Sequence, residues 1–188
     1  MVWPTTWEWV GILLAIIGIL MAVQPFLQMI YGQPKLSIRP SVVMEKETAA
    51  IGLHVSNPPI TEWSLSLLGV TKQTAEGVVI SYMIDEFESG KSILPVTFSH
   101  TYTGAGNPAK RVDIAASDYA SFIPIGAVNK GKVYLDKGGG SELQLLAIGK
   151  YKVTVIIAYG SKKELAYKHL IVSENTPYAS WEMTADES

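Results

Sequence analysis

Residues 151–159 read Tyr-Lys-Val-Thr-Val-Ile-Ile-Ala-Tyr, and this stretch decides the fold of the larger part of the chain. Large apolar side chains occupy every second position, namely Tyr151, Val153, Val155, Ile157 and Tyr159. A period of two residues is typical of a β-strand with one buried face. The sequence Gly-Ser-Lys-Lys at 160–163 predicts a turn into a second strand over Leu165–Ser173. We expect these segments to form an antiparallel hairpin.

The same alternation recurs upstream. Residues 49–56 alternate and end at Asn57-Pro58-Pro59, where proline removes backbone donors. Further strands are expected over Val78–Ile84, Ser92–Ser99, Val112–Ala115, Phe122–Val128, Lys132–Asp136 and Leu143–Leu146. The stretch Thr61–Gly69 predicts one helical turn. Because no amphipathic helix lies between the strands, a mainly β fold with a two-sheet antiparallel sandwich is favoured over a β-α-β fold.

An uncharged apolar run precedes this domain. Residues 10–23 read VGILLAIIGILMAV, and a weaker apolar stretch continues to Tyr31. A helix over residues 9–31 would be about 33 Å long, enough to cross a hydrocarbon core of about 30 Å. We therefore predict one transmembrane helix with the lipid bilayer around it. A cleaved secretory signal is the alternative, but Glu8 and no Lys or Arg precede the run.

The predicted organisation has five parts. They are a short N-terminal tail (1–8), a transmembrane helix (9–31), a linker (32–34), a β-sandwich domain (35–175) and a polar C-terminal tail (176–188), in which Tyr178 and Trp181 could dock on the sandwich. Lys35, Arg39 and Lys46 follow the helix, whereas no Lys or Arg precedes it. The positive-inside rule then slightly favours a single-pass protein with a cytoplasmic C-terminal domain over an extracytoplasmic one.

The composition limits the chemistry that the chain can carry. Its 188 residues are 48% hydrophobic and only 17% charged, with a formal net charge of −2. Lys and Arg are scattered along the sequence, so no nucleic-acid partner is expected. The absence of cysteine excludes disulfides, thiolate nucleophiles and cysteine-ligated zinc.

The segment 145–155, Leu-Leu-Ala-Ile-Gly-Lys-Tyr-Lys-Val-Thr-Val, resembles the Leu-x-x-Gly-x-Tyr-x-Val pattern that opens a late strand in many immunoglobulin-like sandwiches. The resemblance implies a structural corner at Gly149 and Tyr151, in which the Tyr151 hydroxyl bonds to backbone a few residues upstream. The stretches 34–38, 57–60 and 68–71 behind an apolar helix are similar to uncharacterised prokaryotic single-pass membrane-anchored β proteins. That likeness implies an immunoglobulin-like antiparallel β-sandwich and no known activity.

Motifs for phosphate and metal binding are incomplete. Gly90-Lys91-Ser92 is like the end of a phosphate-binding loop, but Asp85 stands where that loop has its first glycine. His54, His100 and His169 are far apart in the sequence and are not paired at metal-ligand spacing. We therefore expect neither a metal nor another cofactor.

The densest group of carboxylates is Asp85, Glu86 and Glu88, at the end of a predicted strand. Beside Lys91, these side chains are expected to be solvated turn residues rather than an acid–base pair. The sequence therefore predicts a protein that is not an enzyme.

Small residues form a stripe along the predicted transmembrane helix, at Gly11, Ala15, Gly18 and Ala22. Spacings of four, three and four residues place them on one face of a helix. Small side chains let two helices approach closely, so this helix-packing stripe predicts a transmembrane helix partner or a homo-oligomer.

These features together predict a membrane-anchored β-sandwich that is a non-catalytic binding or assembly module for an unknown protein partner. The loops Ser99–Arg111 and Lys137–Ser141 are the expected contact points, because a rigid sandwich presents variable loops at its ends. The alternative is a structural subunit of a larger membrane protein complex, held through its transmembrane helix.

Overall fold

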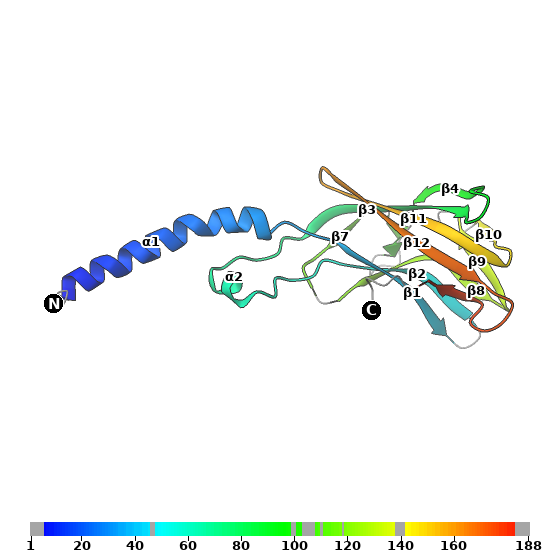
Figure 1. The fold of residues 1–188 in the computed structure, drawn as a ribbon, viewed down its shortest axis with the longest axis horizontal. Coiled ribbons are helices and arrows are strands. Elements are labelled where there is room, and N and C mark those ends of the chain that lie inside the picture. Colours follow the sequence, from blue (N-terminus) through cyan, green and yellow to red (C-terminus); the bar gives the residue numbers. More distant parts are fainter. Residues whose placement is uncertain are drawn as a thin grey trace.

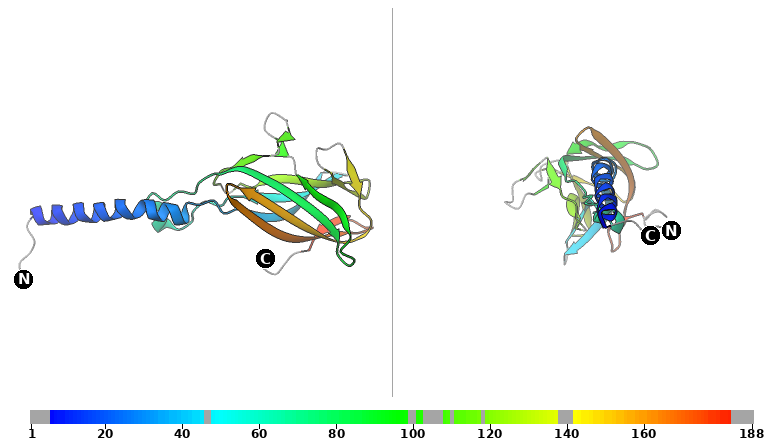
Figure 2. Two further views of the ribbon diagram at one scale, coloured as in Figure 1. Left: turned by 90° about the horizontal axis from the view of Figure 1, so that it is seen from above. Right: turned by 90° about the vertical axis from the view of Figure 1, so that its left-hand side faces the viewer.

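The computed structural model describes residues 6–45, 48–98, 101–102, 108–109, 111–117, 119–137 and 142–182. A long helix, α1 (Thr6–Tyr31), projects from one end of an elongated β domain (Figure 1). Seen end-on, the helix lies over the middle of the domain, so it continues the long direction of the molecule (Figure 2). Within the described residues, α1 is the one helix long and apolar enough to cross a membrane, and none of its side chains is buried.

The remaining elements are short. In chain order they are β1 (Ser37–Glu45), β2 (Thr48–Ser56), α2 (Trp63–Leu67), β3 (Ala75–Glu86), β4 (Ser92–Phe98), β5 (Thr101–Tyr102), β6 (Pro108–Ala109), β7 (Val112–Ile114), β8 (Ser121–Asn129), β9 (Lys132–Asp136), β10 (Leu143–Leu145), β11 (Gly149–Tyr159), β12 (Lys162–Val172) and β13 (Ala179–Trp181). The named strands pair antiparallel throughout.

Two sheets packed face to face confirm the predicted antiparallel sandwich. The first sheet has the order β1-β2-β8-β9-β10, and the second has β13-β12-β11-β3-β4 with β7 also paired to β3. The predicted hairpins β3–β4 and β11–β12 are present, and α2 is the expected helical turn. The strand expected over Val112–Ala115 is present as β7. The described residues also contain four strands that the sequence analysis did not predict, namely β1, β5, β6 and β13. β5, β6 and β13 have only two or three residues, which is too short to show an alternating pattern.

The strand order follows the immunoglobulin arrangement only in part. In that arrangement the first, second and fifth strands adjoin in one sheet, and the third, sixth and seventh adjoin in the other. Here β1-β2-β8 and β3-β11-β12 have this relationship. However, β9 and β10 extend the first sheet beyond β8, where an immunoglobulin domain has its fourth strand.

The core lies between the two sheets and is made by their inward-facing apolar side chains. The alternating residues of β11 are all buried, at 0–4% exposure, as their period predicts. The largest fully buried side chains are Tyr82, Ile51, Leu53, Ile84, Ile123, Ile125, Leu135, Ile157 and Leu170. Such a core fixes the register of the strands that contribute to it, because a slip of one residue would turn their apolar face outward.

The second sheet continues past residue 175 to its last strand, β13. Trp181 on β13 donates its indole N–H to the Ser41 carbonyl of β1 at 3.1 Å, which joins the edges of the two sheets. Tyr178 and Trp181 are partly buried and pack against the core, which confirms that they dock on the sandwich. β1 contains Pro40 and lies at the edge of its sheet, where a missing backbone N–H is tolerated.

Candidate functional site

The last turns of α1 are joined to the sandwich by side-chain hydrogen bonds. The partner is the segment of residues 58–74 between β2 and β3, which carries α2 and is called the α2 loop here. Gln28 Nε2 donates to the Thr71 carbonyl at 2.7 Å, and the Thr71 N–H donates to Gln28 Oε1 at 2.9 Å. Gln24 Nε2 donates to the Gly69 carbonyl at 3.4 Å. The loop therefore lies along the end of α1, as Figure 1 also shows.

Backbone contacts extend this junction past the end of the helix. The Gln73 N–H donates to the Gly32 carbonyl at 2.8 Å, and the Gly32 N–H donates to the Gln28 carbonyl at 2.9 Å. A Cβ atom at residue 32 would lie 2.2 Å from Gln28 Nε2 and 2.4 Å from the Gln28 carbonyl oxygen. Glycine at residue 32 therefore leaves the room in which the Gln28 side chain reaches the loop.

Asn57 is a fully buried polar residue that holds the linker and the α2 loop together. Its Oδ1 accepts the Lys35 N–H at 3.3 Å, and its Nδ2 donates to the Gln73 carbonyl at 2.7 Å. Nδ2 also donates to the Ile114 carbonyl at 3.3 Å, which adds β7 to the network. The asparagine that follows β2 therefore has partners for both side-chain groups, as a buried amide requires.

Cationic side chains gather at the same end of the sandwich. Lys72 Nζ donates to the carbonyl of Tyr31, the last residue of α1, at 3.3 Å. Burial lowers the pKa of Lys72, and the nearby charges of Lys35 and Lys162 lower this pKa further, against the opposite effect of Glu62. Lys35 before β1, Lys72 in the α2 loop and Lys162 at the start of β12 thus lie close to the point where the helix enters the domain.

Pro34 in the linker is held by two side chains from the β11–β12 hairpin. Its carbonyl accepts the Tyr159 hydroxyl at 3.4 Å and Lys162 Nζ at 3.5 Å. Tyr159 also donates to Glu164, and burial together with this bond raises the pKa of Tyr159 to about 12. The single hydroxyl proton of Tyr159 is shared between these two acceptors, and the shorter contact is the one to Glu164.

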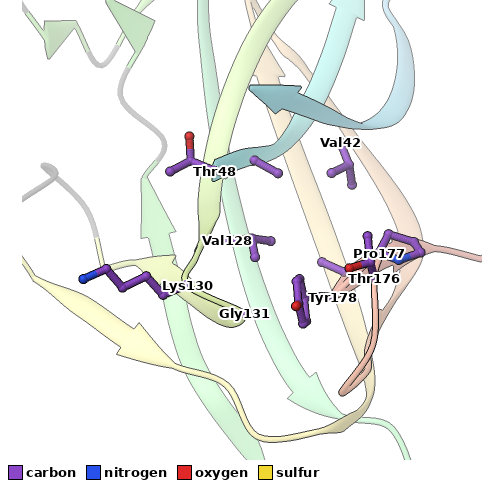
Figure 3. Close-up of a pocket in the computed structure, with 10 residues that line it drawn as sticks. Val42, Thr48, Val128, Lys130, Gly131, Thr176, Pro177 and Tyr178 are labelled. Carbon is purple, nitrogen blue, oxygen red and sulfur yellow. The ribbon is translucent and has the colours of Figure 1, made fainter. Parts of the chain in front are cut away.

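A groove opens at the far end of the sandwich, away from α1. It has a volume of about 320 Å³, within the range of small-molecule sites. Figure 3 shows side chains of Val42, Val128 and Tyr178 converging on it, with Lys130 at its rim. Residues of β1, β2, β8 and the β8–β9 turn line one side of the groove, and residues 176–179 line the other.

A polar cluster of Lys150, His169 and Glu182 forms on the outer face of the second sheet. Glu182 accepts from Lys150 Nζ at 2.8 Å and lies 2.7 Å from His169 Nδ1. The Phe87 ring lies 4.3 Å below Lys150 Nζ and 4.9 Å from the His169 ring. The hydrogen bonds from Lys150 and then His169 lower the pKa of Glu182. Sequence reasoning missed this cluster, because Glu182 reaches β11 and β12 only through the pairing of β13.

The helix-packing stripe lies along the exposed surface of α1. Gly11, Ala15, Gly18 and Ala22 are all exposed, and a Cβ atom added at Gly11 or Gly18 would meet nothing within 4 Å. At about 100° per residue, the centre of the stripe lies more than about 100° around the helix from Gln24 and Gln28. The α2 loop therefore leaves the stripe open.

The predicted structural corner is formed by backbone and one hydroxyl. Tyr151 donates to the Ala147 carbonyl, four residues upstream, at 2.8 Å. The bond ties the start of β11 to the segment that crosses from the first sheet. Burial raises the pKa of the Tyr151 hydroxyl. Gly149 begins β11 in this crossing.

The other sequence motifs lie on the surface. Gly90-Lys91-Ser92 lies in the β3–β4 turn, where Gly90 has φ 66°, and does not open a helix. No group of three or more potential metal ligands occurs within the part of the chain that the structure describes. His100 and most of the loops 99–111 and 137–141 lie outside the described residues.

Comparison with known proteins identifies no relative. No protein-family model matches the chain, and neither the curated proteins nor the solved structures contain a match.

Proposed function

We propose that this protein is a single-pass membrane protein whose β-sandwich is a non-catalytic binding or assembly module. The observation that carries the proposal is the pair of hydrogen bonds between Gln28 and Thr71. These bonds hold the end of α1 against the folded domain, and a signal sequence that is removed would have no need of such a contact, so the junction supports a helix that is retained. A retained apolar helix with no buried side chain is stable only in lipid or against other apolar helices.

The lysines around the junction support a cytoplasmic position for the sandwich. Lys35, Lys72 and Lys162 lie next to the end of α1, whereas no Lys or Arg precedes the helix. Lys35 falls within the stretch of about 15–20 residues after the helix that the positive-inside rule counts. Lys72 and Lys162 come later in the sequence, and their place beside the helix end suits the anionic headgroups of the cytoplasmic leaflet. The prediction is tested by protease treatment of intact cells or spheroplasts. Digestion of the sandwich from outside would reverse the orientation.

The membrane anchor itself is tested by carbonate extraction followed by intact-mass measurement. We expect the protein to stay in the membrane pellet with residues 6–31 present. A water-soluble protein that retains these residues would contradict the anchor, and so would a mature chain that begins after them.

Recognition of a protein partner is proposed for the end of the sandwich that faces away from α1. Exposed apolar side chains there include Phe87, Leu143, Leu145 and Ile148, at 44–61% exposure. Figure 1 places β10, which carries two of them, at that end. Exposed apolar residues gathered at one end of a domain are a common feature of interaction surfaces.

The alternative function is a structural subunit held in a larger membrane complex through the stripe. The open face of Gly11 and Gly18 supports it. Since the chain has no cysteine, single cysteines at Ala15 and at Leu145 can carry cross-linkers that probe the two surfaces separately. Cross-links from Leu145 to another protein favour the recognition module. Cross-links from Ala15 alone, lost in the double variant Gly11→Leu and Gly18→Leu, favour the subunit.

A further inference from the structure

The α2 loop lies beside the apolar part of α1 rather than beyond its end. Leu67, Leu68 and Gly69 at the tip of the loop line a shallow groove together with Ile17, Leu20, Met21 and Gln24 of the helix. Met21 precedes Gln28 by seven residues, so the tip reaches about 10 Å along the helix from that glutamine.

The length of α1 places this level within a bilayer. The helix has 26 residues and is about 39 Å long, whereas a hydrocarbon core is about 30 Å thick and takes about 20 residues. With Glu8 kept outside, the 20-residue window starts at Val10 and ends near Met29. Ile17 and Met21 lie well inside this window. A bilayer that covers α1 must therefore also meet the tip of the loop.

The side chains of α2, between the charged base and the tip of the loop, suit a membrane environment. Trp63 and Leu67 are 74% and 75% exposed in the protein, and residues 63–70 read WSLSLLGV without a charge. In water these side chains would form an uncovered apolar patch, whereas lipid would cover them. Tryptophan is also the residue type most typical of the membrane interface.

Many backbone polar groups of the loop have hydrogen-bond partners within the protein, as a medium without water requires. Leu65 and Ser66 donate to the Glu62 carbonyl, and Val70 donates to the Leu65 carbonyl at 3.0 Å. The Gly69 carbonyl and both Thr71 backbone groups are bonded by Gln24 and Gln28. Non-helical backbone is tolerated at membrane depth where protein groups provide such partners.

Charges lie only at the base of the loop. Glu62 and Lys72 line a hollow with Tyr31 and Lys35, at the level where α1 ends. The change from an apolar tip to a charged base follows the change from acyl chains to headgroups across one lipid leaflet.

We propose that the α2 loop inserts into the lipid leaflet next to the sandwich and forms a second membrane contact beside α1. This inference depends on the proposed membrane anchoring. Its consequence is that the sandwich is held at a fixed height and tilt against the membrane, since a second contact beside the helix restricts the tilting that one helix alone would allow.

The test measures the depth of a spin label at the tip. Leu67→Cys is labelled in the full-length protein, which has no natural cysteine, and the protein is reconstituted in phosphatidylcholine–phosphatidylglycerol vesicles. Leu20→Cys reports on α1, and Leu143→Cys is a matched control because it is an exposed leucine at the far end of the sandwich. Collision rates with oxygen, which concentrates in lipid, and with a water-soluble nickel chelate give the depth of each label.

Insertion predicts that the Leu67 label is severalfold more accessible to oxygen than to nickel, like the Leu20 label, whereas the Leu143 label shows the reverse. A Leu67 label that behaves like Leu143 while Leu20 remains in lipid would overturn the inference and leave the anchor intact. A Leu67 label accessible to neither reagent would also overturn it, because protein rather than lipid would cover the tip. Aqueous behaviour of both Leu20 and Leu67 would instead reject the membrane anchor.

Discussion

The side-chain amide of Gln28 bonds both backbone groups of Thr71, donating to its carbonyl at 2.7 Å and accepting from its N–H at 2.9 Å. Two antiparallel strands exchange the same pair of bonds, so the glutamine serves as a strand-like partner for a loop that has no neighbouring strand. The end of α1 and the α2 loop are therefore coupled, so a substitution in the helix end should alter the stability of the loop conformation.

Gln28→Leu should release the α2 loop from the helix. Loss of two hydrogen bonds at about 1 kcal/mol each corresponds to about 30-fold faster amide exchange around Thr71. Hydrogen-exchange mass spectrometry of the protein in lipid nanodiscs measures this rate. Gln24→Leu is the matched control, because it removes one longer bond of 3.4 Å and should have a smaller effect. Unchanged exchange at Thr71 in Gln28→Leu would show that the coupling is absent.

Asn57→Ala should destabilise the sandwich by about 2–3 kcal/mol, because the variant leaves buried backbone groups without their side-chain partners. Urea unfolding of the full-length protein in detergent measures the loss. Asn175→Ala changes an exposed asparagine and should cost less than about 0.5 kcal/mol. Equal losses in the two variants would contradict the role of Asn57.

Tyr151→Phe should lower the free energy of unfolding by about 1 kcal/mol, since it deletes only the hydroxyl that bonds the Ala147 carbonyl. The same urea titration measures it. Tyr134→Phe, at a half-buried position on β9, is the control for loss of a hydroxyl outside the corner. The corner would contribute nothing to stability if the two variants unfolded at the same urea concentration.

Glu182 should make stability depend on pH in the acidic range. Its pKa is lower in the folded protein than its ordinary value of 4.5, so its ionised form stabilises the fold. At pH 7 the wild type should therefore have a higher melting temperature than Glu182→Gln. This difference in melting temperature should vanish as the pH falls through the lowered pKa of Glu182 in the folded protein. Melting temperatures between pH 7 and pH 2 measure it.

The control for this pH dependence is Glu88→Gln, which changes an exposed carboxylate of the β3–β4 turn. Its melting temperature should follow that of the wild type at every pH. A Glu182→Gln difference that persists or grows at pH 2 would mean that ionisation of Glu182 is not the cause. High salt should reduce the difference, because the cluster is partly exposed.

Local patterns predicted the strands and the helix well. The alternation in β11 and the uncharged run of α1 are properties of neighbouring residues, and the structure confirms both. The strand β1 is less evident because Pro40 interrupts its pattern, and β13 is too short to have one. Both are edge strands, which form because a neighbouring strand is already in place.

The sequence by itself determined that an apolar helix precedes an antiparallel β-sandwich, because periodicity and turn residues act over a few positions. Only the tertiary structure decided that Gln28 meets Thr71, 43 residues later, and that Tyr159 meets Pro34, 125 residues earlier. It also decided that His169 and Glu182 become partners. Such contacts depend on which loops and strand ends the packed sheets bring together, and no local pattern encodes that arrangement.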